Sequence, residues 1–193
     1  MNSPQHSTES NEHYTPPEIV ERARRTMGRI DFDPFSCEAA NKIVQATYYC
    51  TPEIGGDGFL DKWSGEMVFV NPPCGVLDIE YARQIRLAGT RSSAGVAWAR
   101  TVWELINGPV RAAIFVGFNI EILRVGQSAQ FSPMDFAFCV PKSRLKYVEG
   151  KTGKPGPSPP HSSVIICATY DREIEARFLA EFADLGYVRE RAK

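Results

Sequence analysis

The pattern of apolar and polar positions predicts strands and helices that alternate along most of the chain. The clearest strand is Met67–Val70, where four consecutive apolar residues favour a strand that is buried on both faces, since a half-exposed strand would alternate. Other runs rich in apolar, β-branched or aromatic residues predict strands at 30–32, 44–50, 112–116, 136–140 and 163–169. Helical spacing predicts helices at 16–27, 78–88, 96–106, 120–126 and 172–185, with a short one opening near Ser36, Glu38 and Asn41.

This alternation predicts a single α/β domain of three layers. Residues 1 to about 12 are rich in Ser, Asn, Gln and Glu, and we expect them to form a disordered tail. The domain then covers 13–193. Thr15 precedes Pro16 and has Glu18 three residues later, a pattern typical of a capping box at the start of the first helix.

Composition narrows the classes of function. The formal net charge is -1, so binding of nucleic acid would need a local basic patch. The five Cys form no C-x-x-C pair and the three His have no metal-ligand spacing, so we expect reduced thiols and no metal. No apolar run is long enough to span a membrane and the N-terminus has no apolar leader, so a cytoplasmic, monomeric protein is the expectation.

Asn71 follows the predicted buried strand directly and precedes Pro72 and Pro73. The prolines end the strand, because they cannot donate to a β-ladder, and they fix the backbone around the Asn side chain. The Asn71 amide oxygen and the Pro72 carbonyl could then accept both hydrogens of one planar NH2 group and activate its nitrogen for attack on an electrophilic methyl carbon. The alternative is that Asn-Pro-Pro is only a turn.

A second polar group ends an earlier predicted strand. Asp33 and Pro34 follow Ile30–Phe32, which leaves a carboxylate where α/β sheets bind ligands. Its ligand could be an amino-acid ammonium group or a sugar hydroxyl, and an Asx-turn is the structural alternative. No G-x-G-x-x-G is present. Gly55, Gly56 and Gly58 surround Asp57 and would permit a tight loop or close approach to a ligand.

The stretch at about 141–161 predicts a basic, flexible loop between two strands. It is rich in Gly and Pro and carries Lys142, Arg144, Lys146, Lys151 and Lys154 against a single acid, Glu149. Such a loop can contact phosphates, although it could also be no more than a solvated loop.

In their order along the chain, these pieces resemble the phage-type DNA N-6-adenine methyltransferases, the Dam-like family. The resemblance runs from about residue 12 to 170. Its markers are Tyr14-Thr15-Pro16, Asp33-Pro34-Phe35-Ser36, Asn41, Asp57-Gly58 with Trp63, Asn71-Pro72-Pro73, Arg144-Leu145-Lys146-Tyr147 and Pro159-Pro160-His161-Ser162-Ser163.

The resemblance implies a single-domain, Rossmann-like, S-adenosylmethionine-dependent methyltransferase fold and transfer of a methyl group to the N6 amine of adenine in double-stranded DNA. The target base would be flipped out of the helix. Asn71, Pro72, Pro73 and Cys74 would form the catalytic tetrapeptide. The donor would contact Tyr14, Thr15 and Pro16 at its methionine end, the loop Asp33, Pro34, Phe35 and Ser36, and Asp57 at its adenine. The protein would act in a bacterial host cell, encoded by a phage or prophage.

Cys74 departs from the family pattern, which usually has an aromatic residue there to stack on the flipped base. Base–aromatic stacking is worth about 1–3 kcal/mol per base. Another aromatic side chain, Phe35 or Phe118, could stack instead, the enzyme could be slow, or the amine could belong to another substrate. The alternatives are therefore methyl transfer to cytosine N4, RNA adenine or protein glutamine, and a non-catalytic nucleic-acid-binding module.

Overall fold

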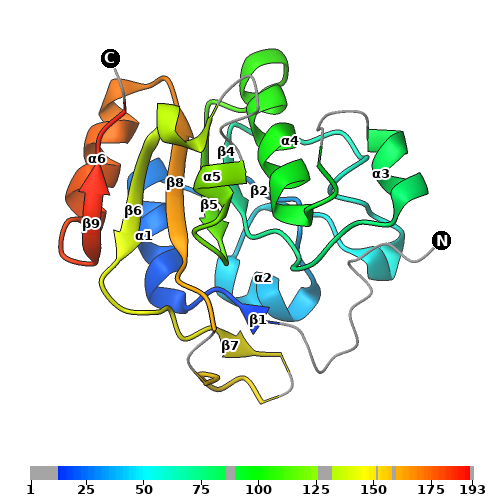
Figure 1. Ribbon diagram of the computed structural model, residues 1–193, viewed down its shortest axis with the longest axis horizontal. Coiled ribbons are helices and arrows are strands. Elements are labelled where there is room, and N and C mark those ends of the chain that lie inside the picture. The colour runs from blue at the N-terminus through cyan, green and yellow to red at the C-terminus, as the bar shows by residue number, and fades with distance from the viewer. Residues whose placement is uncertain (1–12, 86–89, 126–131, 151, 158–159, 192–193) are drawn as a thin grey trace.

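A seven-stranded mixed sheet forms the centre of the protein, as the computed structural model shows for residues 13–85, 90–125, 132–150, 152–157 and 160–191 (Figure 1). The spatial order is β3-β2-β4-β5-β8-β6-β9. The first four strands in this order are parallel, and β8, β6 and β9 each run antiparallel to the strand before. The strands are β2 (Phe32–Asp33), β3 (Tyr48–Tyr49), β4 (Met67–Val70), β5 (Ala112–Gly117), β6 (Ala137–Pro141), β8 (Val164–Thr169) and β9 (Gly186–Arg189).

Helices cover both faces of this sheet, so the predicted three-layer α/β architecture is confirmed. One core joins the sheet to α1, α2 and α6, and the other joins it to α3, α4 and α5. In the view of Figure 1, α1 lies behind β6 and β8. The helices are α1 (Pro17–Met27), α2 (Glu38–Val44), α3 (Ile79–Ile85), α4 (Ser93–Asn107), α5 (Ile122–Val125) and α6 (Arg172–Phe182), with short 3-10 turns at Pro52–Ile54 and Pro133–Asp135.

The unbroken apolar run Met67–Val70 follows from the position of strand β4 between two layers of helices. All four of its residues are buried. Val68 and Val70 face the core under α3 and α4, whereas Met67 and Phe69 face the core under α1 and α6. A strand between two helical layers has no solvent face, so both sets of alternate side chains are apolar.

The strand order places a topological switch point beside β4. From β2 the chain moves outward through α2 to β3, and it then returns to the other side of β2 as β4. Connections that leave β2 and β4 in opposite directions open a crevice at the carboxyl ends of these strands, where α/β proteins bind ligands. Asp33 ends β2 and Asn71 follows β4, so this edge of the sheet carries both predicted polar groups.

Three expectations about local structure were wrong. Helix α1 begins at Pro17 with Pro16 at its N-cap and no side-chain cap, so Thr15 does not form a capping box. Most of 44–50 is not a strand, because Val44 ends α2 and Gln45 takes a left-handed conformation, which leaves only β3. The basic stretch is not simply a loop, since it contains β7 (Val148–Glu149), which pairs antiparallel with β1 (His13–Tyr14).

Neither the small β1–β7 ribbon nor the edge strand β9 was predicted. The ribbon joins the beginning of the described chain to the basic stretch, and it lies beside the crevice edge of the main sheet (Figure 1). The tail at 1–12 lies outside the described residues. Within the described part of the chain, no helix combines the length and apolar character needed to cross a membrane.

Candidate functional site

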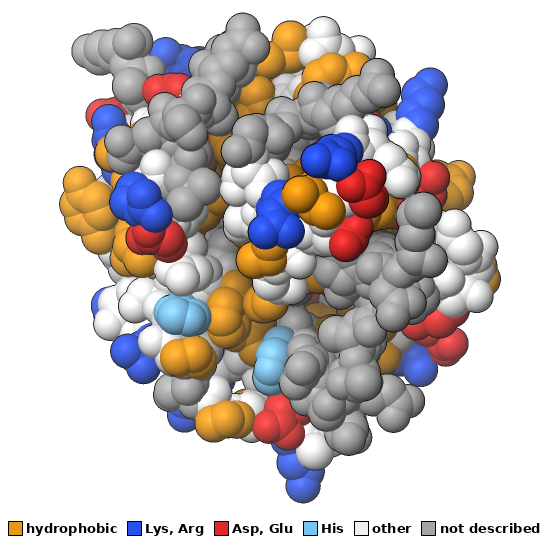
Figure 2. All heavy atoms as spheres, turned by 45° about the vertical axis from the view of Figure 1, so that its right-hand side comes forward, with side chains coloured by type: hydrophobic (Ala, Val, Ile, Leu, Met, Phe, Trp, Pro, Cys, Tyr) orange, Lys and Arg blue, Asp and Glu red, His pale blue; other side chains and the backbone are white. Residues whose placement is uncertain are grey.

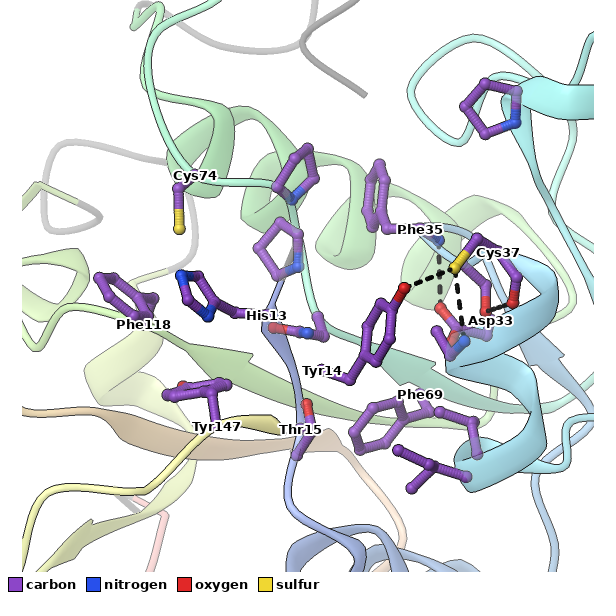
Figure 3. Close-up of a pocket in the computed structure, with 18 of the residues that line it drawn as sticks. His13, Tyr14, Thr15, Asp33, Phe35, Cys37, Phe69, Cys74, Phe118 and Tyr147 are labelled. Carbon is purple, nitrogen blue, oxygen red and sulfur yellow. Dashed lines mark hydrogen bonds between the residues drawn. The ribbon is translucent and has the colours of Figure 1, made fainter. Parts of the chain in front are cut away.

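A cavity of about 220 Å³ opens at the switch point between β2 and β4 (Figure 3). Asp33 and Asn71, which are 38 positions apart in the sequence, both line it, as do Thr15 before α1 and Phe118 after β5. The described part of the chain has no cluster of His, Cys, Asp and Glu that could hold a metal ion. The cavity is built from strand ends and the loops that follow them.

The Asn71-Pro72-Pro73-Cys74 segment is anchored from behind by the N-terminus of α4. The Ser93 hydroxyl donates hydrogen bonds to the carbonyls of Pro73 and Gly75, the latter at 3.1 Å, and the Ser93 N–H also donates to Gly75 at 3.1 Å. Ser93 is itself buried. The hydrogen bonds from Ser93 thus fix the Pro73–Gly75 end of the segment, while Asn71, Pro72 and Pro73 line the cavity.

Asp33 is a buried carboxyl group, with only 2 % of the residue exposed. Its Oδ1 accepts a hydrogen bond from the backbone N–H of Phe35 at 3.1 Å. Burial raises the pKa of Asp33 to about 7, because the desolvation cost of the charged form exceeds the opposing effect of the hydrogen bonds from Phe35 and Ser36. A cationic or hydroxyl-bearing ligand in the cavity would relieve this cost.

Thr15 carries a hydroxyl that has no hydrogen-bond partner among the described residues. The residue is 3 % exposed, its Oγ1 is buried, and the side chain points into the cavity (Figure 3). An unsatisfied buried polar group costs about 1–3 kcal/mol, so a native protein rarely keeps one without a use. This hydroxyl is the strongest sign within the cavity that a polar ligand belongs there.

Nine of the twelve residues predicted for donor binding and catalysis line this one cavity, and the remaining three do not. The nine are Tyr14, Thr15, Asp33, Phe35, Ser36, Asn71, Pro72, Pro73 and Cys74. Pro16 caps α1 through its carbonyl, which accepts from Ile19 at 3.0 Å, and Pro34 is a buried residue behind the loop.

Asp57 is the third residue outside the cavity lining, and its carboxylate is already engaged. It accepts hydrogen bonds from the N–H groups of Phe59 at 2.9 Å and Leu60 at 3.3 Å, and from the Tyr81 hydroxyl at 2.6 Å. These contacts tie the loop 55–60 to α3. These hydrogen bonds give Asp57 a structural role, and the loop approaches the segment 33–36 at Gly58, where a Cβ atom would lie 1.9 Å from the Pro34 carbonyl oxygen.

Several residues that line the cavity were not predicted as site residues from the sequence. Glu53 lies in the 3-10 turn just after β3, and it supplies the acid that no residue within the predicted second strand provides. Its signal was its position three residues beyond Cys50, the expected end of that strand. Cys37, whose Sγ lies 3.5 Å from the Tyr14 hydroxyl, and Tyr147 carried no comparable signal, because only the folded chain brings them to the cavity.

The basic stretch lies next to the cavity and shows a strict alternation before β7. Arg144 and Lys146 are exposed, whereas Leu145 and Tyr147 are buried in the core, and Tyr147 also lines the cavity. Lys142 and Lys154 are exposed as well, and Lys151 lies outside the described residues. Figure 2 shows the two described histidines, in pale blue, on either side of a group of hydrophobic side chains on this face.

No family model matches this chain, and comparisons with curated proteins and with solved structures find no match either.

Proposed function

We propose that the protein transfers the methyl group of S-adenosylmethionine to the exocyclic N6 amine of adenine in DNA. The observation that carries the proposal is the shared cavity: a donor-type carboxylate at the end of β2 and an acceptor-type Asn-Pro-Pro segment at the end of β4 line one space at the switch point of the sheet. Methyl transfer needs a donor and an acceptor amine in line and in contact, and a single cavity with these two polar ends meets that need.

The donor end of the cavity fits an amino acid joined to a nucleoside. Asp33 offers a carboxylate to the donor's ammonium group, and Thr15 offers the hydroxyl that has no partner in the described part of the chain. Glu53, in the turn after β3, offers a carboxylate to the ribose hydroxyls, as acids near a second strand end do in other nucleotide-binding α/β folds. When bound, S-adenosylmethionine supplies an electrophilic methyl carbon whose bonding electron pair leaves with the sulfur.

The acceptor end grips an NH2 group through oxygen atoms. The Asn71 amide oxygen and the Pro72 carbonyl accept its two hydrogens, which draws the nitrogen lone pair out of the ring and toward the methyl carbon. The nitrogen gains the methyl group and then releases one proton to water. Positioning and fixed dipoles carry the rate, so no covalent link to the protein is required.

Exposed cations beside the cavity fit a polyanionic substrate. Arg144, Lys146 and Lys154 would hold phosphates, because contacts of this kind supply affinity without reading sequence. An adenine inside a duplex cannot reach a recessed cavity, so the target base would leave the helix.

The test is tritiated methyl transfer to unmethylated DNA, RNA and protein in parallel, followed by nucleoside analysis of the labelled product. We expect label in N6-methyladenine from DNA, and a loss of roughly 100- to 1000-fold for Asn71→Ala, the size typical when one group that stabilises transition-state charge is removed. Donor binding by Asn71→Ala, measured by calorimetry, should stay close to that of the wild type. Label confined to RNA or protein would overturn the choice of substrate, and unchanged transfer by Asn71→Ala would overturn the mechanism.

A further inference from the structure

Phe118 and Tyr147 line one side of the cavity, and His161 packs against Phe118 from outside the lining. Phe118 follows β5, Tyr147 precedes β7, and His161 precedes β8. The ring centroids of Phe118 and Tyr147 lie 5.4 Å apart, and those of Phe118 and His161 lie 6.0 Å apart in an edge-to-face arrangement. Phe118 is thus held on two sides by rings from other parts of the chain.

Tyr147 acts as a fixed support for Phe118. It is 4 % exposed, and its hydroxyl is hydrogen-bonded at 3.0 Å to the hydroxyl of the buried Ser163. Its ring therefore cannot turn away without breaking this bond. Phe118 is only half-buried and lines the cavity together with Asn71 and Pro72, so part of its ring surface stays open toward the space between them.

The opposite side of that space is lined by a small side chain. Figure 3 shows the Cys74 thiol pointing toward Phe118 across the cavity. Phe35, the other aromatic candidate, is packed with its ring centroid 4.6 Å from that of Phe59 and 6.3 Å from that of Trp63, so the apolar core holds its ring. Phe35 also lines the cavity and is half-buried, but it lies on the Asp33 side, whereas Phe118 lies on the Cys74 side (Figure 3).

We propose that the acceptor stacks on the ring of Phe118. The acceptor amine then belongs to a flat heteroaromatic ring and not to an aliphatic amide such as glutamine. The inference rests on the proposed function and narrows its substrate class. A planar base gains dispersion and electrostatic energy against a fixed ring, whereas a flexible amide side chain has no face to present. Cys74 supplies no aromatic ring on its side of the cavity, so the proposal assigns the stacking contact to Phe118.

The test compares Phe118→Leu, which keeps an apolar side chain of similar size but removes the ring, with Phe118→Tyr, which keeps the ring. We expect kcat/KM for methyl transfer to unmethylated DNA to fall roughly 5- to 150-fold in Phe118→Leu, the loss that corresponds to one base–aromatic contact. Phe118→Tyr should retain most of the activity. Trp103→Leu, which removes an exposed aromatic ring outside the cavity lining, should match the wild type.

A second-site change separates stacking from a general structural role. Adding Cys74→Tyr to Phe118→Leu supplies a ring on the opposite face and should recover activity at least fivefold, which a merely misfolded cavity would not allow. Calorimetric titration of Phe118→Leu with S-adenosylmethionine should give wild-type affinity. If the wild type labels DNA and Phe118→Leu is equally active, stacking of the acceptor on Phe118 is refuted and the proposed function survives. If the wild type labels only protein glutamine, the heteroaromatic acceptor is refuted; label in no substrate refutes the proposed function itself.

Discussion

Replacing Asp33 by Asn should stabilise the ligand-free protein at neutral pH while it weakens donor binding. In the unfolded chain this carboxyl group ionises near its ordinary pKa of 3.8, but in the folded chain burial holds it protonated until about pH 7. Between these two pH values, ionisation of the carboxyl group stabilises the unfolded state but not the folded state. The free energy of unfolding therefore falls as the pH rises from about 4 to about 7, and it is level above that range.

The size of the effect follows from the two pKa values. A rise from 3.8 to about 7 corresponds to about 4 kcal/mol when the pH lies above both values. Asn cannot ionise, and its amide oxygen can still accept the hydrogen bond from the Phe35 N–H, so the variant loses this penalty and keeps the contact. We expect Asp33→Asn to exceed the wild type by up to about 4 kcal/mol at pH 8 and to approach it near pH 4.

Urea denaturation of both proteins at pH 5, 6, 7 and 8 measures this difference. Asp31→Asn, two residues away, is the matched control with the opposite sign. Burial alone would raise the pKa of Asp31, but hydrogen bonds from Arg29 and from the backbone N–H groups of Met67 and Glu66 hold it below its ordinary value. Asp31→Asn should therefore lose stability at neutral pH. A stability difference between Asp33→Asn and the wild type that did not change with pH would refute the reasoning.

The same carboxyl group makes donor binding depend on pH. An ammonium ligand favours the ionised form, so the affinity of the wild type for S-adenosylmethionine should rise between pH 6 and pH 8, and titration calorimetry of Asp33→Asn should show weaker binding without that rise. Equal affinities for both proteins at pH 8 would remove Asp33 from the donor site.

Four further outcomes are expected. Thr15→Val should leave the ligand-free protein equally or more stable in urea, because it removes an unsatisfied hydroxyl, and should weaken donor binding roughly two- to tenfold in calorimetry; unaltered affinity would show that no ligand uses the hydroxyl. Glu53→Gln should weaken S-adenosylmethionine binding by roughly tenfold but should affect methionine alone much less, since only the nucleoside reaches this acid; equal weakening of both would place Glu53 elsewhere. Asp57→Ala should cost roughly 1–3 kcal/mol of stability in urea, because its carboxylate accepts hydrogen bonds from Phe59 and Tyr81, and should leave donor affinity nearly intact, because Asp57 does not line the cavity; lost affinity in a folded variant would return it to the donor site. Lys146→Ala combined with Lys154→Ala should reduce by roughly 2 the slope of log affinity for DNA against log salt, measured by fluorescence anisotropy, and an unchanged slope would exclude both from phosphate contact.

The parts of the fold that the sequence predicted are those with long or unambiguous patterns. Met67–Val70 is an unbroken apolar run that is soon followed by two prolines, so both the strand itself and the point where it ends could be predicted. The strands β1, β3 and β7 have only two residues each, too few for any periodicity to appear. Edge strand β9 is only partly buried, so it shows neither a continuous apolar run nor a clean alternation.

The residues of the candidate site also fall into those that the sequence could predict and those that it could not. Asp33 and Asn71 could be placed in advance, because the carboxyl ends of parallel strands meet at one edge of a sheet. Tyr147 could not, since nothing in its local sequence distinguishes a ring that faces a cavity from a ring in the core, and Phe118 could be named only as one of two candidate rings. For Asp57 the sequence could not show that its carboxylate accepts hydrogen bonds from Tyr81 and from its own loop, and its predicted donor contact stays a prediction.

The pairing of β1 with β7 has a consequence for how the protein matures on the ribosome. His13 pairs with Glu149, so this wall of the cavity cannot form until residue 149 has been synthesised. Strand β8 must then insert between β5 and the earlier β6, which leaves β5 as an open apolar edge until residue 169 emerges. Such long-range pairing slows folding and exposes the growing chain to aggregation. Nascent chains arrested before Val164 should therefore remain sensitive to protease and should bind chaperones.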